Sequence, residues 1–185
     1  MSRISYPAPP LPRAGQLRAW WRAPASATAL AWHIARAAQT HDGPLLVIAR
    51  DNHGANQIEA DLHTLLGADE SLPVVAFPDW ETLPYDAFSP HPDIISQRLA
   101  ALHRLPTLKR GIVVVPVQTL LQQLAPLKYV IGGSFDLKVG QRLDLDAEKR
   151  RLEAAAYRNV PQVMDPGDFA VRGGLLDVFP MGADA

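Results

Sequence analysis

The segment FPDWETLPYDAFSPHPDIISQRLAAL, residues 77–102, joins an apolar strand to an amphipathic helix through a long loop rich in proline and aromatic residues. Four prolines in this loop exclude regular structure and keep the backbone extended. Trp80, Tyr85 and Phe88 are expected to pack and hold the loop in place, with base stacking as the alternative. An ordered connection of this length is usually functional or the remnant of a functional loop.

Helices and strands alternate on both sides of this loop. Short apolar runs predict buried strands, and residues spaced three and four apart predict helices that face a core. This alternation is typical of a doubly wound parallel sheet. The predicted strands are 45–49, 74–77 and 112–115, and the predicted helices are 26–40, 56–66, 93–105 and 117–124.

The pattern changes after Pro126, where a second, smaller part begins. A helix is predicted over 146–156, and short strands over 135–139, 160–164, 169–172 and 175–179. Consecutive short strands with turns between them predict an antiparallel α+β domain, which is incomplete because no closing element follows its last strand. The predicted organisation is a proline-rich lead-in at 1–25, an α/β domain at 26–125 and the α+β domain at 126–185.

Composition restricts the class of protein. The 185 residues carry a formal net charge of −1, which predicts weak DNA binding without preference for damage, because few phosphates would be contacted. Zero cysteines exclude a disulfide scaffold and a thiolate metal site, and they fit a cytoplasmic location. No apolar run approaches the ~18 residues of a membrane span, so no membrane partner is expected.

Motifs for catalysis are missing from the sequence. None of the four lysines lies in a GxxxxGK[ST] phosphate loop, and none of the six histidines has HExxH spacing. Asp79 and Glu81 could form a catalytic carboxylate pair, but they are expected to satisfy backbone donors of the loop instead. Asp69 and Glu70 are expected in a solvated loop. The sequence therefore predicts no catalytic residue, no metal site and no cofactor in this chain.

Four segments, DWETLPYD, SPHPDIISQRL, VPVQTLLQ and RGGLLDVFP, resemble the amino-terminal module of bacterial transcription-repair coupling factors, which is similar to the damage-recognition protein UvrB. The resemblance covers about residues 44–182. It implies a degenerate P-loop-like domain with a parallel sheet, whose phosphate loop would sit at 21–28, where Pro24 and alanines cannot cradle phosphates. It also implies a fragment of a larger protein, in which later strands return to the first sheet.

The resemblance also implies a recognition surface for the repair protein UvrA. Arg158 and Arg172 match positions at which UvrB presents arginines to UvrA, with Phe179 as a companion that is expected to pack inward. The turn at 165–167 is expected to fold the predicted strand 160–164 back beside the predicted strand 169–172, which would place both arginines on one exposed face. Either arginine should be replaceable without loss of folding. Spacing alone favours arginines that solvate strand edges, and the resemblance reverses that preference.

The resemblance therefore implies a non-catalytic fragment that recruits UvrA to stalled RNA polymerase for nucleotide excision repair. By the resemblance, ATP, magnesium, double-stranded DNA and the polymerase engage other parts of the full-length protein, which is a DNA translocase of the helicase and hydrolase type. One alternative is a UvrB-like, ATP-using enzyme that binds damaged DNA, although residues 85–93 are too few for a strand-inserting hairpin. A second alternative is an intramolecular clamp that restrains the motor.

Overall fold

The computed structural model describes residues 9, 11–13, 15–22, 24, 26–67, 71–83, 86–132 and 139–182. Its contacts divide the chain into two compact units. The first unit comprises residues 1–79 and 107–122, and the second comprises 80–106 and 123–185. The domain boundary near residue 126 stays a prediction, and the two units are described separately below.

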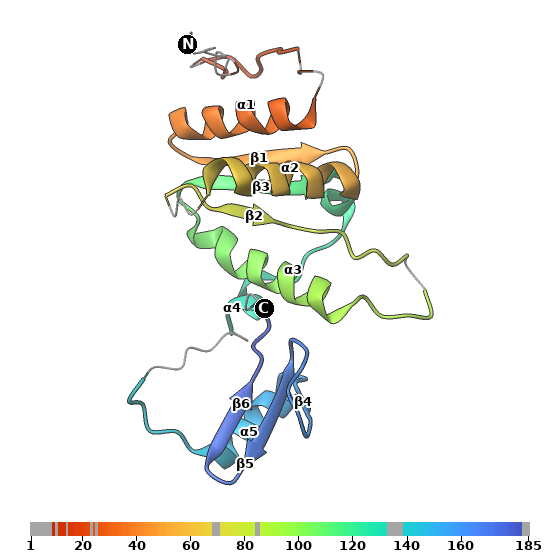
Figure 1. Ribbon diagram of the computed structural model, residues 1–185, viewed down its shortest axis with the longest axis vertical. Coiled ribbons are helices and arrows are strands. Elements are labelled where there is room, and N and C mark those ends of the chain that lie inside the picture. Colours follow the sequence, from red (N-terminus) through yellow and green to blue (C-terminus); the bar gives the residue numbers. More distant parts are fainter. Residues whose placement is uncertain are drawn as a thin grey trace. The chain divides into compact units, whose positions relative to one another are not determined.

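A three-stranded parallel sheet forms the centre of the first unit (Figure 1). Its order is β1-β3-β2, with β1 at Pro44–Ala49, β3 at Gly111–Pro116 and β2 at Val74–Ala76. Every residue of β3 is buried, because this central strand has neighbours on both sides and consists of apolar residues after its first glycine. The predicted parallel sheet is confirmed.

Two helices, α1 at Ala27–Thr40 and α2 at Asn52–Leu66, pack against each other, and α2 packs against the sheet. The core residues of α1 are alanines, which let α2 approach closely with its larger side chains Ile58 and Leu62. Both helices begin at side-chain caps, Ser26 for α1 and Asp51 for α2. After β3 the chain forms a short 3-10 helix, η2 at Val117–Leu121, in place of the longer helix predicted over 117–124.

Gly111 shows how tightly β3 enters the sheet. Its φ is +145°, and a Cβ atom at this position would lie 2.6 Å from the carbonyl oxygen of Pro73. The same carbonyl accepts a hydrogen bond of 2.9 Å from the amide of Ile112. Only glycine therefore fits at the start of this strand.

The second unit contains α3 at Pro92–Arg104, α4 at Leu127–Gly132 and α5 at Leu145–Ala154, and the 3-10 turn η1 at Leu105–Thr107 follows α3. Arg98 of α3 is 2% exposed, and its guanidinium lies 4.0 Å from the centroid of the Trp80 ring. Trp80 thus packs at the base of the long loop, as predicted. The packing predicted for Phe88 is wrong, because this side chain is 82% exposed. Tyr85 lies outside the described residues.

The second unit also contains a mixed three-stranded sheet of order β4-β5-β6. Its strands are β4 at Arg158–Asn159, β5 at Asp168–Arg172 and β6 at Leu175–Val178. The two-part α/β fold is confirmed, but only β5 and β6 are antiparallel, and β4 joins β5 in parallel. Residues 160–164 form no strand, since Pro161 has no amide hydrogen for a ladder. Most of the strand predicted at 135–139 lies outside the described residues.

Candidate partner-binding site

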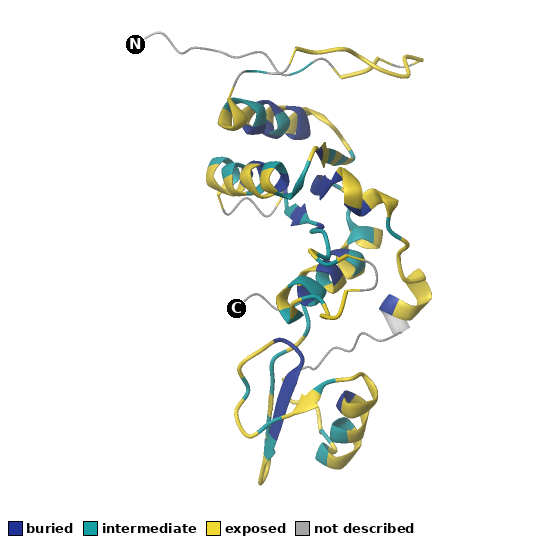
Figure 2. Cartoon of the chain, turned by 90° about the vertical axis from the view of Figure 1, so that its right-hand side faces the viewer, coloured by how far each residue is buried: buried dark blue, intermediate teal, exposed yellow. Residues whose placement is uncertain are grey.

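Strand β5 is the buried strand of the second sheet, and the candidate site residues lie around its two ends (Figure 2). Phe169 has no exposed surface and Ala170 is 2% exposed, whereas Arg172 at the far end is exposed. Phe169 pairs with Val178 and Val171 with Leu176, so these side chains share the core face of the sheet by strand alternation.

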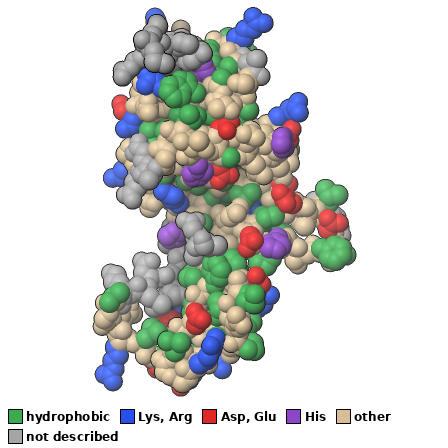
Figure 3. Space-filling view, in the orientation of Figure 1, with side chains coloured by type: hydrophobic (Ala, Val, Ile, Leu, Met, Phe, Trp, Pro, Cys, Tyr) green, Lys and Arg blue, Asp and Glu red, His purple; other side chains and the backbone are tan. Residues whose placement is uncertain are grey.

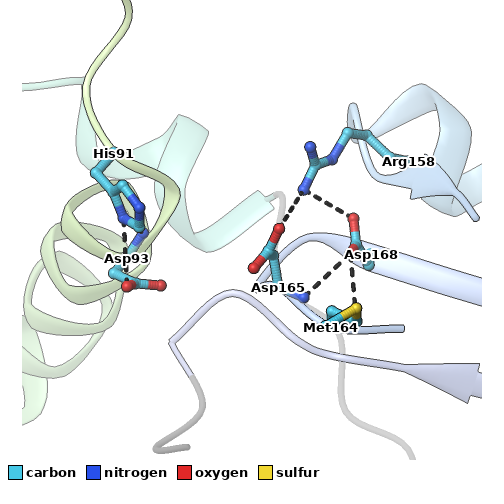
Figure 4. A network of polar contacts seen from close by, with 6 residues as sticks. All are labelled: His91, Asp93, Arg158, Met164, Asp165 and Asp168. Carbon is cyan, nitrogen blue, oxygen red and sulfur yellow. Dashed lines mark hydrogen bonds and ion pairs between the residues drawn. The ribbon is translucent and has the colours of Figure 1, made fainter. Parts of the chain in front are cut away.

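The first end of β5 carries a polar network around Asp168 (Figure 4). One Oδ of Asp168 lies 2.9 Å from Nη2 of Arg158. The other Oδ accepts hydrogen bonds from the amide of Asp165 at 3.1 Å and from that of Met164 at 3.4 Å. The Asp168 side chain is 5% exposed and that of Arg158 is 57% exposed. Arg158 also reaches Oδ2 of Asp165 at 3.4 Å.

This network changes the role expected of Arg158. A nearly buried carboxylate needs a counter charge and hydrogen-bond donors, because transfer out of water is costly. Arg158 supplies the counter charge. The two residues are also partners in the pairing of β4 with β5, so the side-chain ion pair reinforces the contact between these strands. The expectation that Arg158 can be replaced without loss of folding stays a prediction, and the ion pair with Asp168 argues against it.

The second end of β5 is a tight hairpin. Arg172 pairs with Leu175, and only Gly173 and Gly174 lie between them. Gly173 adopts φ +58° at the first central position, a left-handed conformation that two-residue hairpins require and that glycine adopts without strain. Leu175 is 61% exposed, and Arg172 forms no ion pair with any carboxylate in the described part of the chain.

The two arginines are separated along β5. Arg158 pairs with the first residue of β5, Asp168, and Arg172 is four residues further along this strand. At about 3.3 Å per residue, the two positions are roughly 13 Å apart along the strand. The expected fold-back of 160–164 beside β5 is wrong, because β4 pairs with β5 in parallel.

By strand alternation, Arg172, Leu175, Asp177 and Phe179 lie on the sheet face opposite Phe169, and we call these four residues the hairpin face. The same face is buried further along β5, at Ala170. The Phe179 side chain is half-buried, so it neither packs fully into the core, as expected, nor is fully exposed to a partner. Its amide donates to the carbonyl of Asp168 at 2.9 Å, which extends the pairing of β6 beyond Val178. The hairpin face thus combines a cation, apolar surface and a carboxylate on a rigid strand pair.

Sequence reasoning missed Asp168, which is the main partner of Arg158. The signal available was weak: an acidic residue directly before the apolar pair Phe169-Ala170. Tyr157, the neighbour of Arg158, was also missed, and its Oη accepts a hydrogen bond of 2.9 Å from the amide of Met181. The next amide, that of Gly182, donates to Oγ of Ser96 at 2.7 Å, so the segment after β6 is fixed within its unit.

Other candidate residues have structural partners. Ser26 Oγ accepts a hydrogen bond of 3.2 Å from the amide of Ala29, so an ordinary helix cap lies where a phosphate loop would be expected. No strand precedes this cap in the described residues. The Asp79 carboxylate accepts from the side chains of Thr119 and Gln122, not from the backbone as expected. Within the described ranges, no three His, Asp or Glu side chains converge as metal ligands, and no helix is long and apolar enough to cross a membrane. Asp69 and Glu70 lie outside these ranges.

Comparison with known proteins places this site in a family. The UvrB interaction domain family matches residues 135–185, which include both arginines and the hairpin. The transcription-repair-coupling factor of Escherichia coli strain K12 is 46% identical over 151 residues, 82% of this chain and 13% of that protein. Those of Haemophilus influenzae and Mycobacterium bovis are 45% identical over 150 residues and 37% identical over 166 residues, which are 81% and 85% of this chain.

These relatives are much longer than the present chain, which spans 13% of the length of each. The similarity nevertheless covers most of the 185 residues and both structural units. The chain therefore belongs to the transcription-repair-coupling factor family and corresponds to a part of that protein which contains a UvrB interaction domain.

Proposed function

We propose that this chain is the part of a transcription-repair coupling factor that recruits UvrA, and that it does so without catalysis. The observation that carries the proposal is the hairpin face within the region that matches the UvrB interaction domain. Arg172 extends from a rigid two-residue hairpin beside the exposed Leu175, and it has no carboxylate partner in the described part of the chain.

Arginine beside apolar surface is a common arrangement at the centre of protein interfaces. Its planar guanidinium binds carboxylates through two parallel hydrogen bonds, and arginine is enriched among residues whose loss costs most affinity. Arg158 supports this surface from the other end of β5, because it neutralises Asp168 and thereby holds the strand. UvrA would accordingly present carboxylates to Arg172 and an apolar side chain to Leu175.

The wider activity of the full-length protein belongs to the same proposal. ATP and magnesium would serve a motor outside this chain, RNA polymerase and duplex DNA would engage other domains, and the location would be cytoplasmic. The ordinary cap at Ser26 supports the inference that the first unit binds no nucleotide. Calorimetry with magnesium and ATP should therefore give no binding heat, and a micromolar affinity would contradict this part of the proposal.

The intramolecular clamp remains a second candidate because of the loop between β2 and α3. At its tip, Leu83 is 75% and Phe88 is 82% exposed, and Figure 3 shows hydrophobic and acidic side chains there. Residues 77–91 contain three carboxylates and no Lys or Arg. Such a loop suits a protein contact far better than a DNA contact, which disfavours the damage-binding alternative.

A direct binding titration tests UvrA recruitment. UvrA is titrated onto the immobilised chain, and Arg172→Glu is compared with Arg150→Glu, an exposed arginine of α5 in the same unit. We expect saturable binding that Arg172→Glu weakens by at least about thirtyfold, through loss of a charge contact and added repulsion. Equal binding of the parent and both variants would place the contact elsewhere, and absence of binding by the parent would overturn the proposal.

A further inference from the structure

Charge is distributed very unevenly along the first unit, although the net charge of the chain is only −1. Residues 1–41 contain five arginines and no aspartate or glutamate. The same stretch holds three of the four tryptophans of the chain, Trp20, Trp21 and Trp32. The near-neutral total therefore conceals a basic and aromatic segment at the start of the chain.

Most of the described residues that precede α1 are exposed (Figure 2). Trp21 packs edge-on against His33 of α1, with ring centroids 4.7 Å apart and planes at 66°. Trp20 is 84% exposed, and the guanidinium of Arg18 lies 5.9 Å from the centroid of its ring. Trp32 is 42% exposed on the surface of α1.

Four of the five arginines of this segment lie in the described part of the chain, and all four are exposed. We define the basic-aromatic surface by its six described members: Arg13, Arg18, Trp20, Arg22, Trp32 and Arg36. All six are exposed, and within the described ranges none of the four arginines pairs with a carboxylate. Arg36 donates only to the side-chain oxygen of Gln39, a neutral group, at 3.1 Å. Trp32 and Arg36 are four residues apart on α1, so they share one helix face.

We propose that the basic-aromatic surface binds single-stranded nucleic acid. Guanidinium groups contact the phosphates, and exposed indole rings stack on unpaired bases, which is the combination that strand-binding proteins use without reading sequence. A duplex would hide the base faces and leave Trp20 without a stacking partner. An acidic peptide would satisfy the arginines but would offer no regular series of planar rings for the indoles.

The proposal predicts weak, salt-sensitive binding. Four arginine–phosphate contacts give a slope of about −3 for log K against log salt, from about −0.7 per contact for a single strand. Affinity should therefore fall by about 25-fold when salt rises from about 50 to 150 mM. This behaviour agrees with the weak DNA binding expected from the net charge, but it assigns the contact to one segment.

The test is an anisotropy titration of a labelled oligo-dT strand with the whole chain at several salt concentrations. Arg18→Glu/Arg22→Glu is compared with Arg142→Glu/Arg150→Glu, which changes the charge equally at two exposed arginines of the second unit. We expect the first variant to lose at least tenfold in affinity and the control to lose less than twofold. Trp20→Ala should weaken oligo-dT binding at least about fivefold, and circular dichroism should show that every variant is folded.

An abasic strand of equal length separates stacking from charge. Trp20→Ala should leave its binding unchanged, since that strand has no bases to stack. The proposal is overturned if oligo-dT binds both double variants equally, if Trp20→Ala has no effect on oligo-dT, or if duplex DNA or a poly-glutamate peptide of equal charge binds more tightly than oligo-dT.

Discussion

The two ends of β5 carry the two arginines singled out by the sequence, and they differ in what surrounds each guanidinium. At the first end, Arg158 lies 2.9 Å from a carboxylate that is 5% exposed. At the hairpin end, Arg172 lies beside the exposed Leu175 and has no carboxylate partner in the described part of the chain. The same residue type therefore has a nearly buried counter charge at one end of the strand and none among the described residues at the other.

An arginine in a motif is thus not identified as an interface residue until its local partners are known. An arginine already held by a buried carboxylate must break that contact before it binds another one. Its loss also leaves the carboxylate without a counter charge, so a binding defect of such a variant has a folding component. The predictions below separate the two contributions, beginning with the largest effect.

Replacement of Asp168 should give the largest loss of stability. Asp168→Ala removes the acceptor of two backbone amides and leaves Arg158 without its main partner. We expect the second unit to lose about 3 kcal/mol in its free energy of unfolding. Hydrogen exchange of the β5 and β6 amides measures this loss locally. Asp177→Ala, at an exposed position of the same sheet, is the control and should cost within about 0.5 kcal/mol.

Arg158→Ala should destabilise the same sheet by a smaller amount. Its side chain is 57% exposed, so solvent screens part of the ion pair, and we expect a loss of about 1–2 kcal/mol. In a cycle with Asp168→Ala, the two changes should be strongly non-additive because they remove one shared contact. Additive effects would show that the 2.9 Å ion pair does not stabilise the sheet.

The hairpin offers a matched pair of glycine substitutions. Gly173→Ala should cost about 1 kcal/mol of stability, because residue 173 adopts φ +58°, which alanine disfavours. No atom lies within 4 Å of the added Cβ, so a steric clash would not contribute to this cost. Gly174→Ala, which meets no atom within 4 Å either, should cost nothing measurable. Thermal unfolding of both variants tests this. An equal cost at both positions would contradict the turn geometry that presents Arg172.

A carboxylate of the first unit gives the smallest expected effect and contrasts with Asp168. Asp51 caps α2 by accepting from the amide of Gly54 at 2.8 Å, and this bond, helped by Arg50, lowers the pKa of Asp51. A lowered pKa means that the cap stabilises the folded state above the unfolded pKa of about 3.9 and is lost as pH falls through the folded pKa. Stability measured between about pH 5 and pH 2 should decline less steeply in Asp51→Asn, which keeps a neutral cap.

The fold was predictable where one strand or helix shows its own pattern. Residues 112–115 are all apolar and β-branched, and they form the buried central strand β3. The ends of the helices were predicted less well: the helix predicted over 93–105 begins one residue earlier, at Pro92, and His91 occupies the cap position of α3. The 3-10 helix η2 was mistaken for a longer α-helix, since apolar spacing alone does not distinguish the two.

The candidate site was predictable in residue type but not in arrangement. Arg158, Arg172 and Phe179 were singled out before their neighbours were known, and their role in UvrA binding stays a prediction. The parallel pairing of β4 with β5 depends on contacts between residues ten apart in the sequence, which no local pattern encodes. Asp168 was missed for this reason, since its burial results from that pairing.

The most direct test of the central claim is to measure UvrA affinity and unfolding free energy together on Arg172→Ala. We predict that UvrA binding weakens by about 2 kcal/mol or more, as for an arginine at the centre of an interface, while the unfolding free energy stays within about 0.5 kcal/mol of the parent. A folded Arg172→Ala chain that binds UvrA as tightly as the parent would contradict the account.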